Sequence, residues 1–219
     1  MRAWCVLLAL LVAGAAGAAA PDRSPRPVPR VGAEADVVVS QARRSSGAIC
    51  GTRTAVGRAM AAIPGDLPGC GVAEPYWVTE VAGVRLNQGA ILDCRTVAAL
   101  ETWVDDGLLP AAGRRRGGPA ALRVAAHYDC RTRNNQPGAK VSEHGKGRAI
   151  DISAITFRDG TVLTVLEGWG RGRDGRLLRR LHRTACGPFG TVLGPEADRF
   201  HRDHFHFDTA PRRSQSYCR

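Results

Sequence analysis

Two short segments contain four of the six histidines of this chain, and together they constrain how it can fold. The first runs from Ser142 to Asp151 and carries His144 and the aspartate on either side of two glycines, and the second runs from His201 to His206. A straight strand would separate the side chains of His144 and Asp151 by about 23 Å, and one helix would separate them by about 10 Å. A single ion spans neither distance, so a shared site requires the chain to fold back between the two residues.

The glycines of the first segment predict where the chain turns. Gly145 and Gly147 give the backbone the conformational freedom that a tight turn needs. Arg148 to Ile152 is then predicted to be a strand that carries Asp151. Glu143 precedes His144 in the sequence. On an extended chain its side chain would point away from an ion bound by His144, so it is expected at the surface.

The second segment predicts a strand with two different faces. His204 and His206 are two residues apart, so on a strand both imidazoles project from the same face. Phe205 and Phe207 would then face the core. Two or three imidazoles with one carboxylate are borderline-soft ligands, which suit zinc better than calcium or magnesium. The spacing allows His204 to be either a further ligand or a neighbour of the metal.

The N-terminal residues predict export. Met1 and Arg2 form a short basic start, and the apolar run from Val6 to Ala20 is too short for an ordinary membrane span. This pattern is typical of a cleaved signal peptide at residues 1–20, with a membrane anchor as the alternative. After cleavage we expect no stable transmembrane span, and a periplasmic or secreted protein.

The rest of the chain predicts a tail followed by one domain. Residues 21–46 contain four prolines and several arginines, which is typical of a linker or tail. Residues 47–219 are long enough for one domain with a substantial core.

Six cysteines remain once Cys5 has left with the signal peptide. An even number of cysteines in an exported chain predicts disulfides. Order along the chain favours three pairs, Cys50 with Cys70, Cys94 with Cys130, and Cys186 with Cys218. A zinc site made of cysteines is the alternative, but the sequence has no Cys-x2-Cys pair.

Hydrophobic periodicity predicts an α+β domain. The predicted strands are residues 76–81, 122–128, 149–155 and 161–165, with a turn at 158–160 between the last two. The predicted helices are residues 91–108 and 174–185, and the run Cys186-Gly187-Pro188 ends the second. The expected fold is a small antiparallel sheet flanked by helices, with zinc on one sheet face and disulfides that stabilise it.

The charge balance predicts an anionic partner. The formal net charge is +11 at pH 7, and Lys140 and Lys146 are the only lysines, so nearly all of the positive charge is arginine. Such a balance attracts anions over a long range. For an exported protein, an anionic wall polymer or membrane surface fits better than nucleic acid, since the aromatic interleaving of single-strand binding is absent. The arginine bias of a GC-rich genome is the alternative explanation.

The histidine motifs resemble those of known zinc peptidases. The pattern Ser-x-His-x6-Asp that ends at Asp151, followed by the His-x-His that ends at His206, looks like the zinc site of the D-alanyl-D-alanine metallopeptidases, the lysostaphin-type endopeptidases and hedgehog domains. The longer pattern from His201 is similar to that of the penicillin-insensitive murein endopeptidases.

A closer resemblance covers most of the chain. Four runs, at residues 128–138, 142–151, 192–195 and 204–208, resemble the bacterial extensin-like C-terminal domain family. This resemblance extends over residues 47–219.

The resemblance to the zinc peptidases implies that His144, Asp151 and His206 bind Zn²⁺. Three protein ligands leave a fourth position for water, which is the arrangement of a catalytic site. Zinc acidifies that water and polarises a scissile carbonyl, so the implied reaction is amide hydrolysis.

The same resemblance implies four catalytic residues. As in the murein endopeptidases, His204 would be a catalytic histidine that does not bind the metal, with His201 beside it. As in the D-alanyl peptidases, the general base would be an acid three residues before the last ligand, here Asp203. In the D-alanyl peptidases an arginine stabilises the carbonyl oxygen or the substrate carboxylate. The resemblance assigns this role to Arg131, with Arg133 as the alternative.

The expected function is therefore an exported zinc-dependent peptidase that hydrolyses peptide bonds of peptidoglycan, D-amino-acid bonds above all. The alternative is a non-catalytic wall-binding or structural domain that retains a metal site. The set of His201, Asp203 and His204 favours catalysis, since a structural site would not need it. Expected partners are peptidoglycan peptides or another anionic wall polymer and no nucleic acid, and the oligomeric state stays open.

Overall fold

The structure is a computed structural model that describes residues 48–212 and 215–219. The predicted signal peptide at 1–20 and the predicted tail at 21–46 lie outside the described residues. Among the described helices, none has the length and apolar character needed to cross a membrane.

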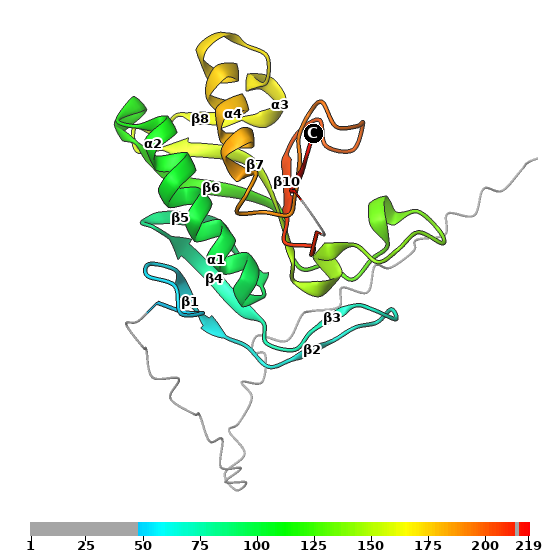
Figure 1. Ribbon diagram of the computed structural model, residues 1–219. Helices are drawn as coiled ribbons and strands as arrows, with labels where there is room; N and C mark the ends of the chain where they lie inside the picture. Colours follow the sequence, from blue (N-terminus) through cyan, green and yellow to red (C-terminus); the bar gives the residue numbers. More distant parts are fainter. Residues whose placement is uncertain (1–47, 213–214) are drawn as a thin grey trace, which may run out of the picture. The chain divides into compact units, whose positions relative to one another are not determined.

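A nine-stranded sheet forms the centre of the described residues (Figure 1). From one edge to the other, eight of its strands are β1 (Val56–Ala59), β4 (Tyr76–Val81), β5 (Val84–Leu92), β6 (Pro119–Ala126), β7 (Ala149–Phe157), β10 (Phe205–Asp208), β9 (Thr191–Leu193) and β11 (Tyr217–Cys218). The ninth, β8 (Val162–Thr164), pairs with β7. A separate two-stranded sheet consists of β2 (Ile63–Pro64) and β3 (Gly71–Val72). With the helices, this arrangement confirms the α+β class.

The sheet differs from the prediction in size and in strand direction. It is larger than the small sheet expected, and it is mixed: β5 runs parallel to β6, with Leu86 opposite Leu122, and β11 runs parallel to β9. Adjacent parallel strands need a crossover connection rather than a tight turn. The helical segment between β5 and β6 supplies that crossover.

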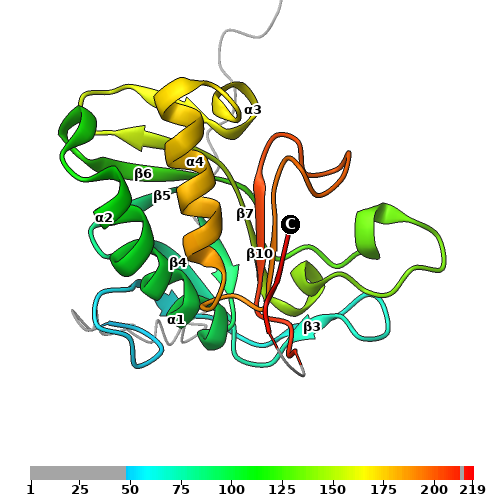
Figure 2. The ribbon, with the colours of Figure 1, turned by 45° about the horizontal axis from the view of Figure 1, so that its top comes forward.

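One face of the sheet is covered by α1 (Cys94–Thr102), α2 (Leu109–Ala112) and α4 (Gly172–Ala185). The other helical segments are α3 (Val165–Gly168), a π-helical turn at Trp103–Leu108, and 3-10 turns at Arg115–Gly117, Arg133–Asn135 and Glu143–Lys146. Both ribbon views show α1, α2 and α4 over the strands (Figure 1, Figure 2). The predicted helix at 91–108 begins later than expected, because β5 continues to Leu92 and the Asp93 carboxylate, which accepts from the Thr96 N–H at 2.8 Å, caps α1.

The main core lies between these helices and the sheet. Trp103 is 1% exposed, its indole N–H donates to the carbonyl of Leu181 in α4 at 3.0 Å, and its ring centroid lies 5.0 Å from that of Phe207. Phe205 and Phe207 are both buried, as predicted for the core face of this strand. The opposite face of β10 is thereby left for His206.

Three disulfides join parts of the chain that are far apart in sequence. They are Cys50–Cys94, Cys70–Cys130 and Cys186–Cys218. The first two correct the predicted pairing, because the fold, not the order along the chain, decides which Cα atoms come within 5.1 and 5.6 Å of each other. Three disulfides are typical of a protein that folds in an oxidising compartment.

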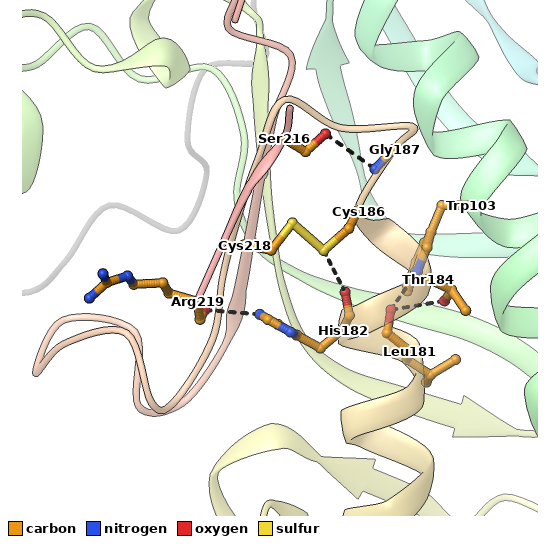
Figure 3. Close-up of a disulfide and its surroundings, with 9 residues drawn as sticks. All are labelled: Trp103, Leu181, His182, Thr184, Cys186, Gly187, Ser216, Cys218 and Arg219. Atoms are coloured by element: carbon orange, nitrogen blue, oxygen red, sulfur yellow. Dashed lines mark hydrogen bonds between the residues drawn. A yellow bond between two sulfur atoms is a disulfide. The ribbon is translucent and has the colours of Figure 1, made fainter. Parts of the chain in front are cut away.

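The third disulfide was predicted correctly. Cys186–Cys218 joins the end of α4 to β11 (Figure 3). Beside it, the His182 ring and the carbonyl of Arg219 form a hydrogen bond of 3.0 Å. The C-terminal strand is thus attached to α4 by one covalent bond and one polar contact.

Candidate metal centre

Strands β7 and β10 position two of the predicted ligands. The strands pair antiparallel, with His206 directly opposite Asp151. Directly opposite residues lie on the same face of a sheet and within reach of each other. Their apolar neighbours along both strands are buried in the core, so the two polar side chains are held on the other face.

The third predicted ligand, His144, lies in the turn before β7. The Ser142 hydroxyl caps this turn by accepting from the N–H of His144 at 3.4 Å, and Gly147 ends it in a left-handed conformation with φ of 66°. The fold-back that the sequence required is therefore present. Gly145 has a different role, because a Cβ at this position would lie 2.8 Å from Sγ of Cys70. It is needed for close packing and not for the turn.

The three side chains converge on one point. Oδ1 of Asp151 lies 2.9 Å from Nδ1 of His206 and 3.3 Å from Nε2 of His144, and these two nitrogens are 3.2 Å apart. A tetrahedral zinc ion with bonds of about 2.0–2.1 Å places its ligand atoms about 3.3 Å from one another. All three residues are buried. The donor set therefore fits zinc in both type and spacing.

Outer hydrogen bonds determine which imidazole nitrogen faces the centre. Nδ1 of His144 lies 2.7 Å from the carbonyl oxygen of His127, which can only accept, so this nitrogen carries the hydrogen. Nε2 of His206 likewise donates to the carboxylate of Asp208 at 3.1 Å. In neutral imidazoles the two inward nitrogens then carry lone pairs, beside a carboxylate. Three electron-pair donors at this spacing repel one another unless a cation lies between them.

The pKa values of the site reflect the same demand for positive charge. Burial would lower the pKa of His206, but its hydrogen bonds to Asp151 and Asp208 outweigh burial and raise the pKa to about 9. Burial would raise the pKa of Asp151, but hydrogen bonds with His144 and His206 outweigh it and hold that pKa far below its usual range. Either a proton or a metal cation satisfies this demand.

Two further histidines lie beside the centre. Nε2 of His204 is 3.6 Å from Oδ2 of Asp151, and its Nδ1 is 2.8 Å from Oδ1 of Asp203. His201 bonds Asp198 through Nδ1 at 2.7 Å, and its ring centroid lies 5.3 Å from that of His204. Burial lowers the pKa of His201 more than the neighbouring Asp198 raises it. Among the described residues, His204 stands outside the group whose ligand atoms all lie within 4.8 Å of one another.

An open cavity of about 500 Å³ adjoins the centre. Its lining includes the three predicted ligands, both neighbouring histidines, and the arginines Arg131, Arg133 and Arg212. Arg131 is held by Asp129, whose Oδ2 lies 2.8 Å from its Nε. The structure thus brings six of the seven predicted site residues to this cavity. The seventh, Asp203, reaches it only through His204, and its side chain is 64% exposed.

Some groups around the site were not among the predicted residues. Asp198 could have been found, because it lies three residues before His201, within reach across one turn. The contribution of His127 could not, because it is made by a backbone carbonyl that every residue possesses.

The prediction that Glu143 lies at the surface is wrong. Its side chain is 8% exposed, because the 3-10 turn directs it inward where an extended chain would not. Oε1 accepts from Lys146 at 2.8 Å, and Oε2 has no hydrogen-bond partner within the described residues.

Comparison with known proteins identifies one family over most of the chain. The family described as extensin-like protein C-terminus matches residues 41–219. No curated protein and no solved structure matches the chain.

Proposed function

The chain belongs to the extensin-like protein C-terminus family, and we propose that it is an exported zinc-dependent peptidase that cleaves peptide bonds of peptidoglycan. One observation carries the proposal: three donor atoms, from His144, Asp151 and His206, have the spacing of a tetrahedral zinc site beside an open cavity. The resemblance of the motifs to D-alanyl-D-alanine metallopeptidases and murein endopeptidases supports the substrate class, with D-amino-acid bonds favoured.

The three ligands are prepared for a metal by their surroundings. Zinc held by them would leave one coordination position open, and would polarise a scissile carbonyl and acidify a water molecule. The carbonyl of His127 and the carboxylate of Asp208 hold the two imidazole rings in one orientation and one tautomer. Such outer partners raise the affinity of a site because its ligands need not reorganise.

His204 is proposed to transfer the proton. Its Nδ1 is engaged by Asp203, so Nε2 is the nitrogen that faces the centre, 3.6 Å from Oδ2 of Asp151. An imidazole in this position can take a proton during attack and return it to the leaving amine. The side chain of Asp203 is 64% exposed and contacts His204. This supports a role in positioning His204, in place of the general-base role. His201, braced by Asp198, packs beside His204.

Arg131 is proposed to bind the substrate carbonyl oxygen or carboxylate. Its Nε donates to Asp129 and its Nη1 donates to the carbonyl of Thr132 at 3.3 Å, so the guanidinium has a fixed orientation at the cavity. A fixed planar fork suits a carboxylate, and it also suits a carbonyl oxygen that gains negative charge during attack. Arg133, which lines the same cavity and is exposed, is the alternative.

Digestion of purified peptidoglycan tests the proposal. The zinc-loaded mature protein should release new muropeptides, identified by mass analysis, and a chelated sample should release none. His204→Ala should also release none while it still binds one zinc ion, because His204 is not one of the three ligands. Arg123→Ala, an exposed position on β6, is the control that should keep full activity.

The same experiment separates the two candidate functions. An absence of cleavage by the zinc-loaded protein would remove the peptidase proposal. If that protein nevertheless cosediments with the wall, the wall-binding alternative would replace it. Loss of zinc from His204→Ala would instead make His204 a fourth ligand and the site a closed one.

A further inference from the structure

Four arginines surround a second cavity, formed by α4 and the segment at the end of α2. The cavity has a volume of about 420 Å³. Its lining consists of Ala111, Leu177 and the four residues that we call the arginine groove: Arg115, Arg173, Arg176 and Arg180. No lining residue is acidic, and none is shared with the cavity at the metal centre.

The charges of the groove have no counter-charge within residues 48–212 and 215–219. In this part of the chain, none of the four arginines has a carboxylate oxygen within 4.0 Å. Arg116, which follows Arg115 in the chain, is by contrast paired with Asp174 at 3.1 Å. Arg173, Arg176 and Arg180 follow one another at spacings of three and four residues on α4, where like charges repel. A bound anion would relieve this repulsion.

The first turn of α4 strengthens the preference for anions. The helix has 14 residues, and Arg171 at its N-cap position makes no side-chain capping bond. The unsatisfied N–H groups and the dipole of such a helix end attract negative charge. A neighbouring cavity is lined by Arg171 and Arg173 from this end and by Arg115 of the groove. Two acids, Glu167 and Asp174, also line it, and Asp174 lies in the first turn of α4, so the positive charge without a partner is concentrated in the groove itself.

One exposed apolar side chain lies beside these arginines, and a second is on the helix that precedes α4. Val162 is 44% exposed and lines the neighbouring cavity together with Arg115 and Arg173. Leu166, in α3, is 62% exposed. Both ribbon views place α3 next to α4 (Figure 1, Figure 2). A soluble wall polymer offers no apolar layer for these side chains, whereas a phospholipid surface presents phosphates above an apolar layer.

We propose that the arginine groove, together with Val162 and Leu166, docks the domain on a membrane surface rich in anionic phospholipid. The guanidinium groups bind lipid phosphates, for which their planar fork is well suited. The two apolar side chains enter the boundary between headgroups and acyl chains. The groove shares no lining residue with the cavity at the metal centre, so docking uses none of the residues proposed to bind metal or substrate.

Cosedimentation with vesicles tests this proposal. The protein should partition onto phosphatidylglycerol–phosphatidylcholine vesicles and not onto vesicles of phosphatidylcholine alone. Arginines near an anionic surface contribute additively, so the triple variant Arg173→Gln, Arg176→Gln, Arg180→Gln should lower the partition coefficient on the order of 100-fold. Glutamine retains helix propensity, and the double variant Arg176→Gln, Arg180→Gln serves if the triple does not fold.

The matched control removes the same charge elsewhere. Arg58, Arg85 and Arg123 are exposed on β1, β5 and β6, and their triple change to glutamine should leave the partition coefficient nearly unchanged. If both triple variants lost vesicle binding equally, net charge alone would explain binding, and the proposal that the groove docks on the membrane would be wrong.

Two further experiments test whether the phosphate groups that the groove binds belong to lipids. Leu166→Ser should weaken vesicle binding several-fold and leave the affinity for inorganic tripolyphosphate unchanged. Retention on an anionic wall polymer or a DNA duplex, with no partitioning onto vesicles, would overturn the membrane assignment.

Discussion

The metal centre and the arginine groove differ in whether their charged side chains have partners of opposite charge. At the metal centre each charged group has a partner: Asp151 contacts His144 and His206, and His206 also contacts Asp208. In the groove, four arginines line one cavity and have no carboxylate partner within the described part of the chain.

Burial explains the difference between the two regions. A buried charge without a partner costs several kcal/mol, so the carboxylates of Asp151 and Asp208 are paired with imidazoles at the metal centre. This arrangement favours an added proton or metal cation. In the groove, Arg173, Arg176 and Arg180 are exposed and Arg115 is half-buried. Solvent screens exposed charges, so they can remain unpaired until an anion binds. Under the two proposals, the first region binds one cation of defined geometry and the second binds anions of varied geometry.

Replacement of Trp103 should disturb both regions at once. Its ring packs against Phe207, the neighbour of His206, and its N–H donates to Leu181 in the helix that carries the arginines. Trp103→Ala removes a fully buried aromatic side chain, which costs about 3–5 kcal/mol. Denaturant unfolding of the zinc-loaded protein measures this loss in the free energy of unfolding.

The control for this experiment is an exposed apolar residue. Leu166→Ala should change the free energy of unfolding by no more than about 0.5 kcal/mol. Two separate unfolding transitions in Trp103→Ala, one for each region, would contradict the shared core.

Loss of the Asp208 carboxylate should affect the metal centre alone. Asp208→Asn keeps the shape of the side chain but removes the charge that orients His206, and such changes lower metal affinity about 10–100-fold. Competition with a chelating dye measures the zinc affinity, and the partition coefficient on vesicles should stay constant. Asp203→Asn changes the same charge next to His204 and should leave zinc affinity nearly unchanged, so equal losses in both variants would refute the specific role of Asp208.

Local sequence patterns predicted the elements that depend on near neighbours. The predicted strand at 76–81 coincides with β4, and the turn at 158–160 lies between β7 and β8. The predicted helix at 174–185 begins two residues earlier than expected and ends where expected. The period of apolar side chains encodes these elements, because each one buries its apolar face.

Features that depend on contacts between distant parts of the chain could not be predicted from local sequence patterns. The parallel pairing of β5 with β6 and two of the three disulfides depend on strand order, which no local pattern contains. At the site, motif spacing predicted that His144, Asp151 and His206 converge. It could not predict that Glu143 turns inward, because this depends on a 3-10 turn in place of extended chain.

The buried carboxylate of Glu101 makes part of the folding stability depend on pH. Burial would raise the pKa of Glu101, but hydrogen bonds from Thr54 and Arg53 outweigh burial and lower it below its ordinary 4.5. The resulting stability is fully present above pH 4.5 and is lost as the pH falls through the lowered pKa of the folded state.

Glu101→Gln measures this contribution. The variant should be less stable than the wild type by about 1.5 kcal/mol at pH 7, because it loses hydrogen bonds to a charged acceptor. The difference should shrink in denaturant titrations at pH values below 4.5. A difference that does not change with pH would show that the charge of Glu101 is not involved.

Asp174 provides the smallest and most specific test, because within residues 48–212 and 215–219 it is the one acid that pairs with Arg116, next to Arg115 of the groove. Asp174→Asn releases Arg116, and one more free arginine near an anionic surface should raise the partition coefficient about fivefold. The same change removes a favourable carboxylate from the first turn of α4 and should lower the free energy of unfolding by about 0.3–1 kcal/mol. Asp66→Asn, at an exposed position between β2 and β3, changes the net charge equally and should do neither. If Asp66→Asn raises vesicle binding as much as Asp174→Asn does, net charge governs docking. The absence of carboxylate partners in the groove would then have no role in binding.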